Sequence, residues 1–164
     1  MRYKYKILLL IAPAVFLLDQ WTKHLIMQRL SIGESITVVT GYFDLVHYRN
    51  AGAAFGMLSN LGDGIREPFF YGISGIALLI LIYAFLHLEE DNYFYPIPLS
   101  LIAGGVLGNF VDRVRFGNVV DFISLHIHDK MIGNISLEWP AFNVADSAIT
   151  ISMILLFAHT FRKK

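Results

Sequence analysis

PFFYGISGIALLILIYAFLHL, at positions 68–88, contains no Asp, Glu, Lys or Arg. A helix needs about 20 apolar residues to cross the hydrocarbon of a bilayer, and this stretch is long enough to do so. Three more stretches, at about 6–27, 92–111 and 139–161, are similarly long and apolar. The sequence therefore predicts a mainly α membrane protein with four transmembrane helices.

The composition fits a membrane protein better than a soluble one. Hydrophobic residues make up 55% of the 164 positions and charged residues only 16%, whereas soluble domains carry about 25% charge. Basic and acidic residues balance at 13 each, so the charge gives no reason to expect a nucleic-acid partner. The chain has no cysteine, which excludes disulfides, thiolate metal sites and a thiol nucleophile. With no linker or internal repeat, 1–164 is expected to form a single integral-membrane domain.

The first apolar stretch has an alternative interpretation as a cleaved signal peptide. Arg2, Lys4 and Lys6 precede the apolar run Ile7–Leu18, which is the order of a signal sequence. However, no A-x-A cleavage site follows, and the helical pattern continues through Asp19–Lys23. We therefore interpret this stretch as the first membrane helix.

The basic residues at the two ends of the chain predict the orientation. Four spans place both termini on one side, and the positive-inside rule makes that side cytoplasmic. The loops on the other side also carry basic residues, but those at the termini are denser: Arg2, Lys4, Lys6, Arg162, Lys163 and Lys164. We expect both termini in the cytoplasm, with the longer loops outside.

The outer connections are predicted to contain β-structure. In the long connection at about 29–67, Ser35–Val39 and Tyr42–Val46 are β-rich runs separated by Thr40-Gly41, which is typical of a hairpin. After the third helix, Val119–Ile127 is also typical of an extended strand. We expect a small β-platform on the outer membrane surface.

Polar residues from three helices are predicted to lie at one depth, near the outer ends of these helices. An ionised carboxylate at a helix centre costs roughly 2.5–3.5 kcal/mol, so charged residues in such segments are functional candidates. Asp121 lies just beyond the third apolar stretch and is expected at the same depth as the polar residues on the helices. The residues on the helices are Asp19 and Lys23 on the first, Asn109, Asp112 and Arg113 on the third, and Asn143 and Asp146 on the fourth. Their convergence predicts a site.

Several of these residues also have a structural interpretation. We expect Asp19 with Lys23, and Asp112 with Arg113, to be ion pairs or orienting partners, because buried charges need partners. Asp121 and Asp146 are different, since no Lys or Arg lies at neighbouring helical spacing around Asp146. These two aspartates are our candidates for chemistry.

Small and loop residues have simpler roles. Gly104 and Gly108 have the spacing of a close helix contact, and Gly52 permits a tight turn after Asn50, whose amide can reach a peptide backbone. His126 and His128 alternate on one strand face, but no third ligand is evident beside them. We therefore predict no metal site and no cofactor.

Two neighbouring carboxyl groups suggest acid–base hydrolysis. They cannot both ionise easily, so the pair holds one proton. The ionised member can take a proton from an attacking water, while the protonated member can donate to the scissile carbonyl oxygen. The residues alone leave open which aspartate has which role.

Five segments, in this order along the chain, resemble the motifs of bacterial lipoprotein signal peptidase (signal peptidase II), a family of aspartic peptidases. They are DQWTK (19–23), NAGAAF (50–55), GGVLGNFVDR (104–113), VVDF (119–122) and FNVAD (142–146). The resemblance implies an inner-membrane endopeptidase that removes the signal peptide from diacylglyceryl-modified prolipoproteins, on the amino side of the lipidated cysteine. It also implies that Asp121 and Asp146 are the catalytic pair. The implied supporting residues are Asp19, Lys23, Asn50, Gly52, Gly108, Asn109, Asp112, Arg113 and Asn143.

The resemblance also shapes our expectations about partners. We expect prolipoproteins and membrane lipids as partners and a monomeric enzyme. One departure from the family pattern is an apparently longer excursion at His126–Glu138. The alternative functions are a small proton-coupled transporter, whose acidic residues usually lie near the bilayer midplane, and a membrane scaffold protein.

Overall fold

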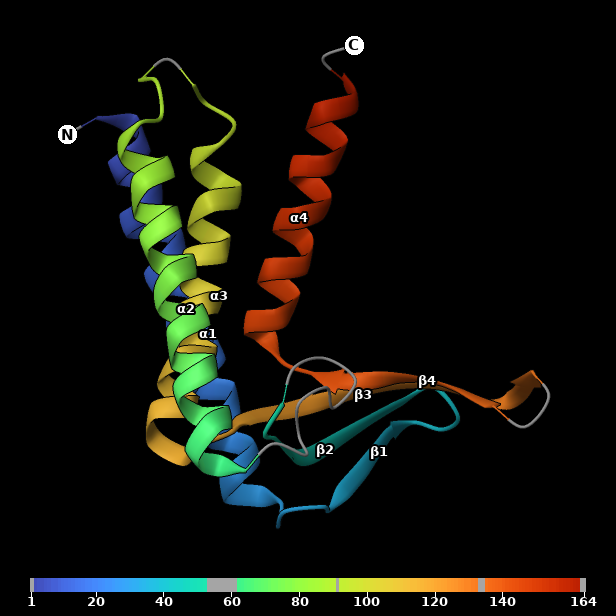
Figure 1. The fold of residues 1–164 in the computed structure, drawn as a ribbon. Coiled ribbons are helices and arrows are strands. Elements are labelled where there is room, and N and C mark those ends of the chain that lie inside the picture. Colours follow the sequence, from blue (N-terminus) through green and yellow to red (C-terminus); the bar gives the residue numbers. More distant parts are fainter. Residues whose placement is uncertain (1, 53–61, 91, 133–134, 163–164) are drawn as a thin grey trace.

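The computed structural model describes residues 2–52, 62–90, 92–132 and 135–162, although the side chains of Asp63, Arg66, Glu67 and 128–138 fall outside the description. Figure 1 shows helices standing side by side on a sheet, with both chain termini at the far end. The elements are α1 (Tyr3–Arg29), β1 (Ser35–Val39), β2 (Phe43–Asn50), α2 (Asp63–Leu86), α3 (Pro96–Phe116), β3 (Val119–Ile132), β4 (Ile135–Phe142) and α4 (Val144–Arg162).

The four helices are long and apolar enough to cross a membrane, as the sequence predicts. The spanning segments are Tyr3–Arg29, Pro68–Leu86, Pro96–Phe116 and Val144–Arg162. Their outward side chains are large and apolar. Leu79 on α2 is 67% exposed and Phe157 on α4 is 68% exposed, which suits contact with lipid tails.

Four helix boundaries differ from the predicted ones by four or five residues. Helix α2 begins at Asp63 and not near Pro68, and α3 begins at Pro96 and not near Asn92. The fourth helix begins at Val144 and not near Trp139, because Trp139 and Phe142 pair with Leu125 and Ile123 of β3. The apolar residues at the start of the predicted fourth span therefore belong to β4. The third helix runs five residues further than position 111 and ends at Phe116, where Gly117 takes a left-handed φ of 71°. That conformation is a common helix stop because glycine adopts it without steric cost.

Helix α3 is packed between α1 and α4, and its glycines allow the close approach. A Cβ at Gly104 would lie 2.7 Å from the carbonyl oxygen of Ala12 on α1. A Cβ at Gly105 would lie 2.6 Å from the carbonyl oxygen of Ala145 on α4. The close helix contact predicted from Gly104 and Gly108 is therefore present, and Gly105 extends it to a second helix.

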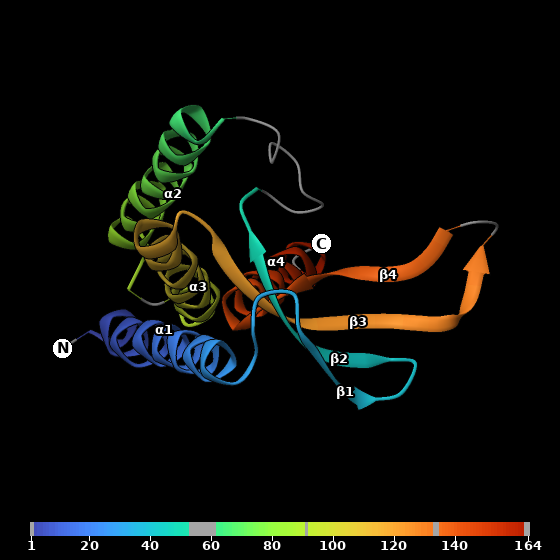
Figure 2. The ribbon, with the colours of Figure 1, turned by 90° about the horizontal axis from the view of Figure 1, so that it is seen from below.

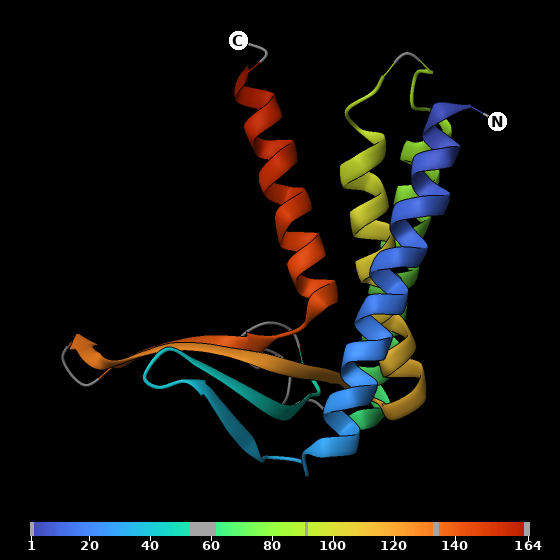
Figure 3. The same ribbon diagram turned by 180° about the vertical axis from the view of Figure 1, so that it is seen from behind.

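Helix α4 stands partly apart from the other helices. In Figures 1 and 3 it diverges from α1–α3 toward its C-terminal end, whereas its first turn meets α3 and the sheet. Ser152 holds the middle of α4 to α3, since its hydroxyl donates to the carbonyl oxygen of Pro98 at 2.6 Å.

The four strands form one antiparallel sheet in the order β1–β2–β3–β4. The predicted hairpin is present: β1 and β2 are joined by a turn in which Tyr42 N–H donates to the Val39 carbonyl and Gly41 has φ 81°. The longer segment noted at His126–Glu138 belongs to the β3–β4 pair, which it extends away from the helices. Figure 2, seen from below, shows this pair extending well beyond α4.

The sheet has an apolar face and a polar face. Ile36, Leu45, Ile123 and Phe142 pair in register across the four strands and so lie on one face. Leu45 and Ile123 of this row pack against Ile26 and Leu30 at the end of α1. The neighbouring row, Thr37, Asp44 and Ser124, projects to the opposite face. The apolar face therefore turns toward the helices.

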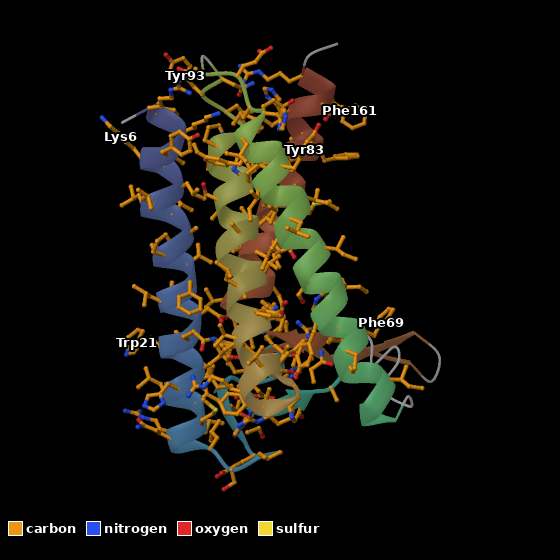
Figure 4. All side chains as sticks on the ribbon, turned by 60° about the vertical axis from the view of Figure 1, so that its left-hand side comes forward. Lys6, Trp21, Phe69, Tyr83, Tyr93 and Phe161 are labelled. Atoms are coloured by element: carbon orange, nitrogen blue, oxygen red, sulfur yellow. The ribbon has the colours of Figure 1, made fainter. Side chains whose placement is uncertain are left out.

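Aromatic and basic side chains mark the two ends of the bundle. Figure 4 places Lys6, Tyr83, Tyr93 and Phe161 at the end with the termini, while Trp21 and Phe69 lie toward the sheet. Aromatic rings favour the two boundaries of a bilayer. The membrane therefore covers the helices, and the sheet lies at one of its surfaces.

Candidate active site

A cavity of about 600 Å³ lies where the sheet meets the ends of α3 and α4. Its walls include residues from the predicted set: Asn50, Gly52, Asn109, Arg113, Asp121 and Asp146. The remaining predicted residues are buried: Asp19, Lys23, Asp112 and Asn143 at 1% exposure or less, and Gly108 on α3. The structure therefore brings polar residues of α1, α3 and α4 to one place, as the sequence predicts. Strands β2 and β3 contribute Asn50 and Asp121 to the same place.

Asp121 lies on β3 and is only 3% exposed. Its Oδ1 accepts the side-chain amide of Asn143 at 2.8 Å, and its Oδ2 accepts that of Asn50 at 3.0 Å. Burial, followed by the negative charge of Asp146, raises the pKa of Asp121 to about 7. Asp121 can therefore keep a proton at neutral pH.

Asp146 is the third residue of α4 and belongs to the cap of that helix. The Asn143 backbone N–H donates to its Oδ2 at 3.2 Å, and its own backbone N–H donates to Asn143 Oδ1 at 2.9 Å. This is a reciprocal capping box. The other oxygen of the carboxylate, Oδ1, accepts the side-chain amide of Asn109 at 2.7 Å. Asp146 is thus closer to the helix start than the predicted boundary implied.

Asn143 connects the two aspartates. The backbone N–H of Asn143 holds Asp146, and its side-chain amide reaches Asp121. The same amide also lies 3.1 Å from Asn109 Oδ1. All three asparagine amides donate to a candidate carboxylate: those of Asn50 and Asn143 to Asp121, and that of Asn109 to Asp146.

A buried charge cluster lies behind the aspartates. Lys23 Nζ lies 2.8 Å from Asp19 Oδ2 and 2.8 Å from Asp112 Oδ2, and all three side chains are at most 1% exposed. The predicted pair of Asp19 and Lys23 is present. The expected pairing of Asp112 with Arg113 is wrong, because Asp112 turns toward Lys23 on the opposite helix. Residues adjacent in sequence on a helix do not face each other.

The two carboxylates of this cluster hold the backbone next to each candidate aspartate. Asp19 Oδ1 accepts the backbone N–H of Ala145 at 3.0 Å, one residue before Asp146. Asp112 Oδ2 accepts the backbone N–H of Val120 at 3.1 Å, one residue before Asp121. Lys23 therefore neutralises the two carboxylates that fix α4 and β3 in place.

Arg113 lines the cavity but takes part in no ion pair among the described residues. Its guanidinium lies 4.9 Å from the ring centre of Phe70, and one of its N–H groups is 3.5 Å from the Asn109 carbonyl. The Tyr71 hydroxyl donates to the carbonyl of Arg113 at 3.0 Å. The cation is thus held by α2 and α3 while facing the two aspartates.

The two predicted glycines have steric and turn roles. Gly52 N–H donates to Asn50 Oδ1 at 3.0 Å, which forms a tight turn after β2 and directs the Asn50 amide toward Asp121. At Gly108, a Cβ would lie 2.5 Å from Asp19 Oδ2. Gly108 therefore leaves room for the buried charge cluster.

Three residues near the site were missed by the sequence reasoning. Gln20 donates to Asp112 Oδ1 at 2.9 Å and to the Gly108 carbonyl at 3.2 Å, which ties the cluster to α3. A polar residue beside Asp19 in an apolar helix was an available signal. Leu125 and Trp139, cross-strand partners, form part of the cavity wall and are 43% and 64% exposed.

The described residues contain no group of three side chains suited to hold a metal ion. His126 Nε2 lies 3.8 Å from Asp44 Oδ2, on the sheet and outside the cavity lining. The side chains of His128 and Asp129 lie outside the described part. The candidate carboxylates also sit at the sheet end of the bundle, which is unlike the midplane position usual in a transporter.

Comparisons with known proteins point to one family. The family model for signal peptidase (SPase) II matches residues 11–162. A lipoprotein signal peptidase of Syntrophotalea carbinolica is 42% identical over 97% of this chain and 93% of its own length. One from Geobacter sulfurreducens is 37% identical over 100% of this chain and 97% of its own length.

A solved structure agrees as well. A bacterial membrane enzyme determined by the in meso method at 2.3 Å resolution superimposes with a TM-score of 0.81 at 38% identity. The match covers 98% of this chain and 91% of the other. The chain belongs to the signal peptidase II family, the lipoprotein signal peptidases.

Proposed function

We propose that Asp121 and Asp146 are the catalytic pair with which this peptidase cleaves prolipoproteins, on the amino side of a diacylglyceryl-modified cysteine. The observation that carries the assignment is that Asn143 bonds to both carboxylates, which line one cavity. A pair held in this way can share one proton and serve as acid and base together.

In the proposed resting state Asp121 carries the proton and Asp146 is ionised. The pKa of about 7 for Asp121 depends partly on the negative charge of Asp146, which agrees with a protonated Asp121 beside an ionised Asp146. The position of Asp146 at the amino end of α4 also suits a negative charge, because the helix dipole is positive there.

The reaction follows from these protonation states. Asp146 takes a proton from water while the water oxygen attacks the scissile carbonyl carbon. Asp121 donates its proton to the carbonyl oxygen, which gives a neutral tetrahedral gem-diol. When this intermediate collapses, Asp146 returns its proton to the leaving nitrogen, and Asp121 recovers a proton from one of the two hydroxyls as the carbonyl re-forms. The C–N bond breaks, and both side chains regain their starting states.

The position of the cavity suits a substrate that is already anchored in the membrane. One wall is formed by Ile149, Thr150 and Ile151 in the spanning part of α4, and another by Leu125 and Trp139 of the sheet. Acyl chains of the substrate can stay in the bilayer while the peptide lies over the aspartates. Holding the scissile bond at this height is a positioning effect.

The proposed orientation places this site at the outer face of the bacterial inner membrane. The basic residues Arg2, Lys4, Lys6 and Arg162 lie at the opposite end of the helices from the sheet. The positive-inside rule assigns that end, with both termini, to the cytoplasm. Exported precursors would then meet the cavity from the side on which they are processed.

The test uses two purified precursors that differ in one residue. A prolipoprotein whose acceptor cysteine carries diacylglycerol is compared with a serine variant that cannot be lipidated, using purified enzyme in the same lipid mixture. The lipidated precursor should be cleaved far faster, at a bond just before the cysteine as read by mass spectrometry. Equal rates would show that the peptide alone is recognised, and would overturn the positioning role of the lipid.

A further inference from the structure

A second hollow lies at the opposite end of the molecule from the catalytic cavity. It has a volume of about 490 Å³ and is lined by Phe94, Leu155, Ala158, His159 and Arg162. Phe94 precedes α3, and the other residues belong to the last turns of α4. This is the region where α4 diverges from the other helices (Figure 3).

Aromatic rings and apolar side chains form part of the hollow. The rings of His159 and Phe94 are stacked at 3.9 Å with an angle of 11° between their planes. Tyr95 meets the same histidine ring edge-on at 5.4 Å. Leu155 and Ala158 line the side nearer the middle of the membrane. These contacts place the histidine ring beside the apolar side of the hollow, formed by Leu155 and Ala158.

The rim of the hollow is cationic. Arg162 lines it, and no acidic residue is among the described lining residues. Within the described part of the chain, neither Arg162 nor the ring nitrogens of His159 has a hydrogen-bond partner or ion-pair partner. By contrast, Arg2 at the same end pairs with Glu90. The donors at this rim are thus available to an anion.

We propose that this hollow binds one anionic phospholipid of the leaflet next to the termini. Its phosphate would meet Arg162 and His159, and the upper part of one acyl chain would lie against Leu155 and Ala158. A guanidinium at a membrane surface suits phosphate because it presents several N–H donors in one plane. Leu155 and Ala158, which line the hollow next to these donors, belong to the spanning helix α4, and apolar side chains beside a cation suit a lipid better than a free anion.

Bound there, the lipid would fill the space beside the free end of α4. The opposite end of this helix carries Asp146 in its first turn. The proposal concerns binding and is independent of the assignment of the catalytic pair. Its test therefore measures lipid binding and stability, with no cleavage assay.

The experiment titrates phosphatidylglycerol into the purified protein in a zwitterionic detergent. The thermal midpoint is read from unfolding curves, and bound lipid is measured by native mass spectrometry. Parallel titrations use phosphatidylcholine and inorganic phosphate. Three variants are compared with the unmodified chain. Arg162→Gln removes the cation, Ala158→Phe fills the apolar side of the hollow without changing charge, and Lys6→Gln removes an exposed cation at the same end.

We expect phosphatidylglycerol to bind more tightly than phosphatidylcholine, and inorganic phosphate to have no effect. A basic residue near a membrane surface contributes about 1 kcal/mol to anionic lipid binding, so Arg162→Gln should weaken it about fivefold. Ala158→Phe should weaken it as well, and Lys6→Gln should not.

Three results would overturn the proposal. Unchanged affinity in Arg162→Gln or in Ala158→Phe would mean that the lipid does not occupy this hollow. An equal loss in Lys6→Gln and Arg162→Gln would indicate diffuse attraction to a basic surface. Stabilisation by inorganic phosphate equal to that by the lipid would indicate a simple anion site.

Discussion

Asn143 and Asp146 each accept the backbone N–H of the other, at 2.9 Å and 3.2 Å. This exchange uses the side-chain oxygen of Asn143 and leaves its NH₂ group directed at Asp121, 2.8 Å away. One residue therefore starts α4 and orients the strand carboxylate at the same time. These two tasks can be separated by substitution.

Asn143→Ser is expected to keep the helix start and impair catalysis. Serine is a good N-cap, so α4 should still form, but it cannot reach Asp121 with an amide. Because Asp121 is protonated in the proposed resting state, this is a bond to a neutral group, which contributes about 0.5–1.5 kcal/mol, so the cleavage rate should fall roughly 2- to 10-fold. The measurement is kcat together with the thermal midpoint.

The control for this variant is Asn118→Ser. Asn118 is a half-buried asparagine near the sheet. Its side chain bonds to Arg49 and the Phe116 carbonyl, and to neither aspartate. It should retain nearly full activity. If Asn143→Ser cleaved as fast as Asn118→Ser, the amide of Asn143 would have no part in orienting Asp121.

Lys23→Met is expected to destabilise the fold. The substitution keeps the length of the side chain but leaves Asp19 and Asp112 buried without a cation. Removing one partner from a buried ion pair costs about 3–5 kcal/mol. Folded yield and the thermal midpoint in detergent should both drop, whereas Lys6→Met at an exposed position should change neither. A stable but inactive Lys23→Met protein would instead place this lysine in the chemistry.

Gly108→Ala should disturb the same cluster by steric contact. The new Cβ would lie 2.5 Å from Asp19 Oδ2, so the carboxylate would have to move away from Lys23. Gly72→Ala on α2 is the matched control, because no atom lies within 4 Å of its Cβ. We expect a lower thermal midpoint and lower activity for Gly108→Ala, and no loss for the control. Equal behaviour of the two variants would contradict the packing of α3 against α1.

The pH dependence follows from the raised pKa of Asp121. The unfolded chain releases this proton near pH 3.8, whereas the folded protein keeps it until about pH 7. The folded state thus binds more protons between these values, and the associated stability is lost as the pH rises through 7. Asp121→Asn lacks this titration, so its thermal midpoint should exceed that of the unmodified protein at pH 8 and approach it at pH 5. A constant difference across this range would exclude Asp121 as the titrating group.

The same titration should appear in catalysis. If protonated Asp121 is the acid, kcat/KM should fall as the pH rises through about 7. A rate that instead rises through this pH would assign the role of base to Asp121.

Features that depend on local sequence were predictable. The spans follow from apolar length, and the β1–β2 hairpin follows from β-rich runs around Thr40-Gly41. The aspartates could be singled out because charge near lipid is expensive. Each of these inferences needs only residues that are close together in the chain.

Features that depend on tertiary contacts were not predictable in the same way. Asp112 pairs with Lys23, 89 positions away, and not with its neighbour Arg113. Trp139 and Phe142 look like part of an apolar helix but pair with β3. Apolar content alone does not separate a strand from the start of a helix. The pairing of β4 with β3 determines that α4 begins only at Val144.

The central claim is that Asp121 and Asp146 perform the cleavage, and the most direct test is the single-residue carboxamide pair. Asp121→Asn and Asp146→Asn keep the shape of each side chain but cannot exchange the proton. With a lipidated precursor and purified enzyme, we expect the cleavage rate of each to fall by about 10²- to 10⁴-fold or more. Membrane insertion and yield should stay near normal, and Asp44→Asn, on the polar face of the sheet, should cleave at the unmodified rate. Appreciable turnover by either active-site variant would contradict the account.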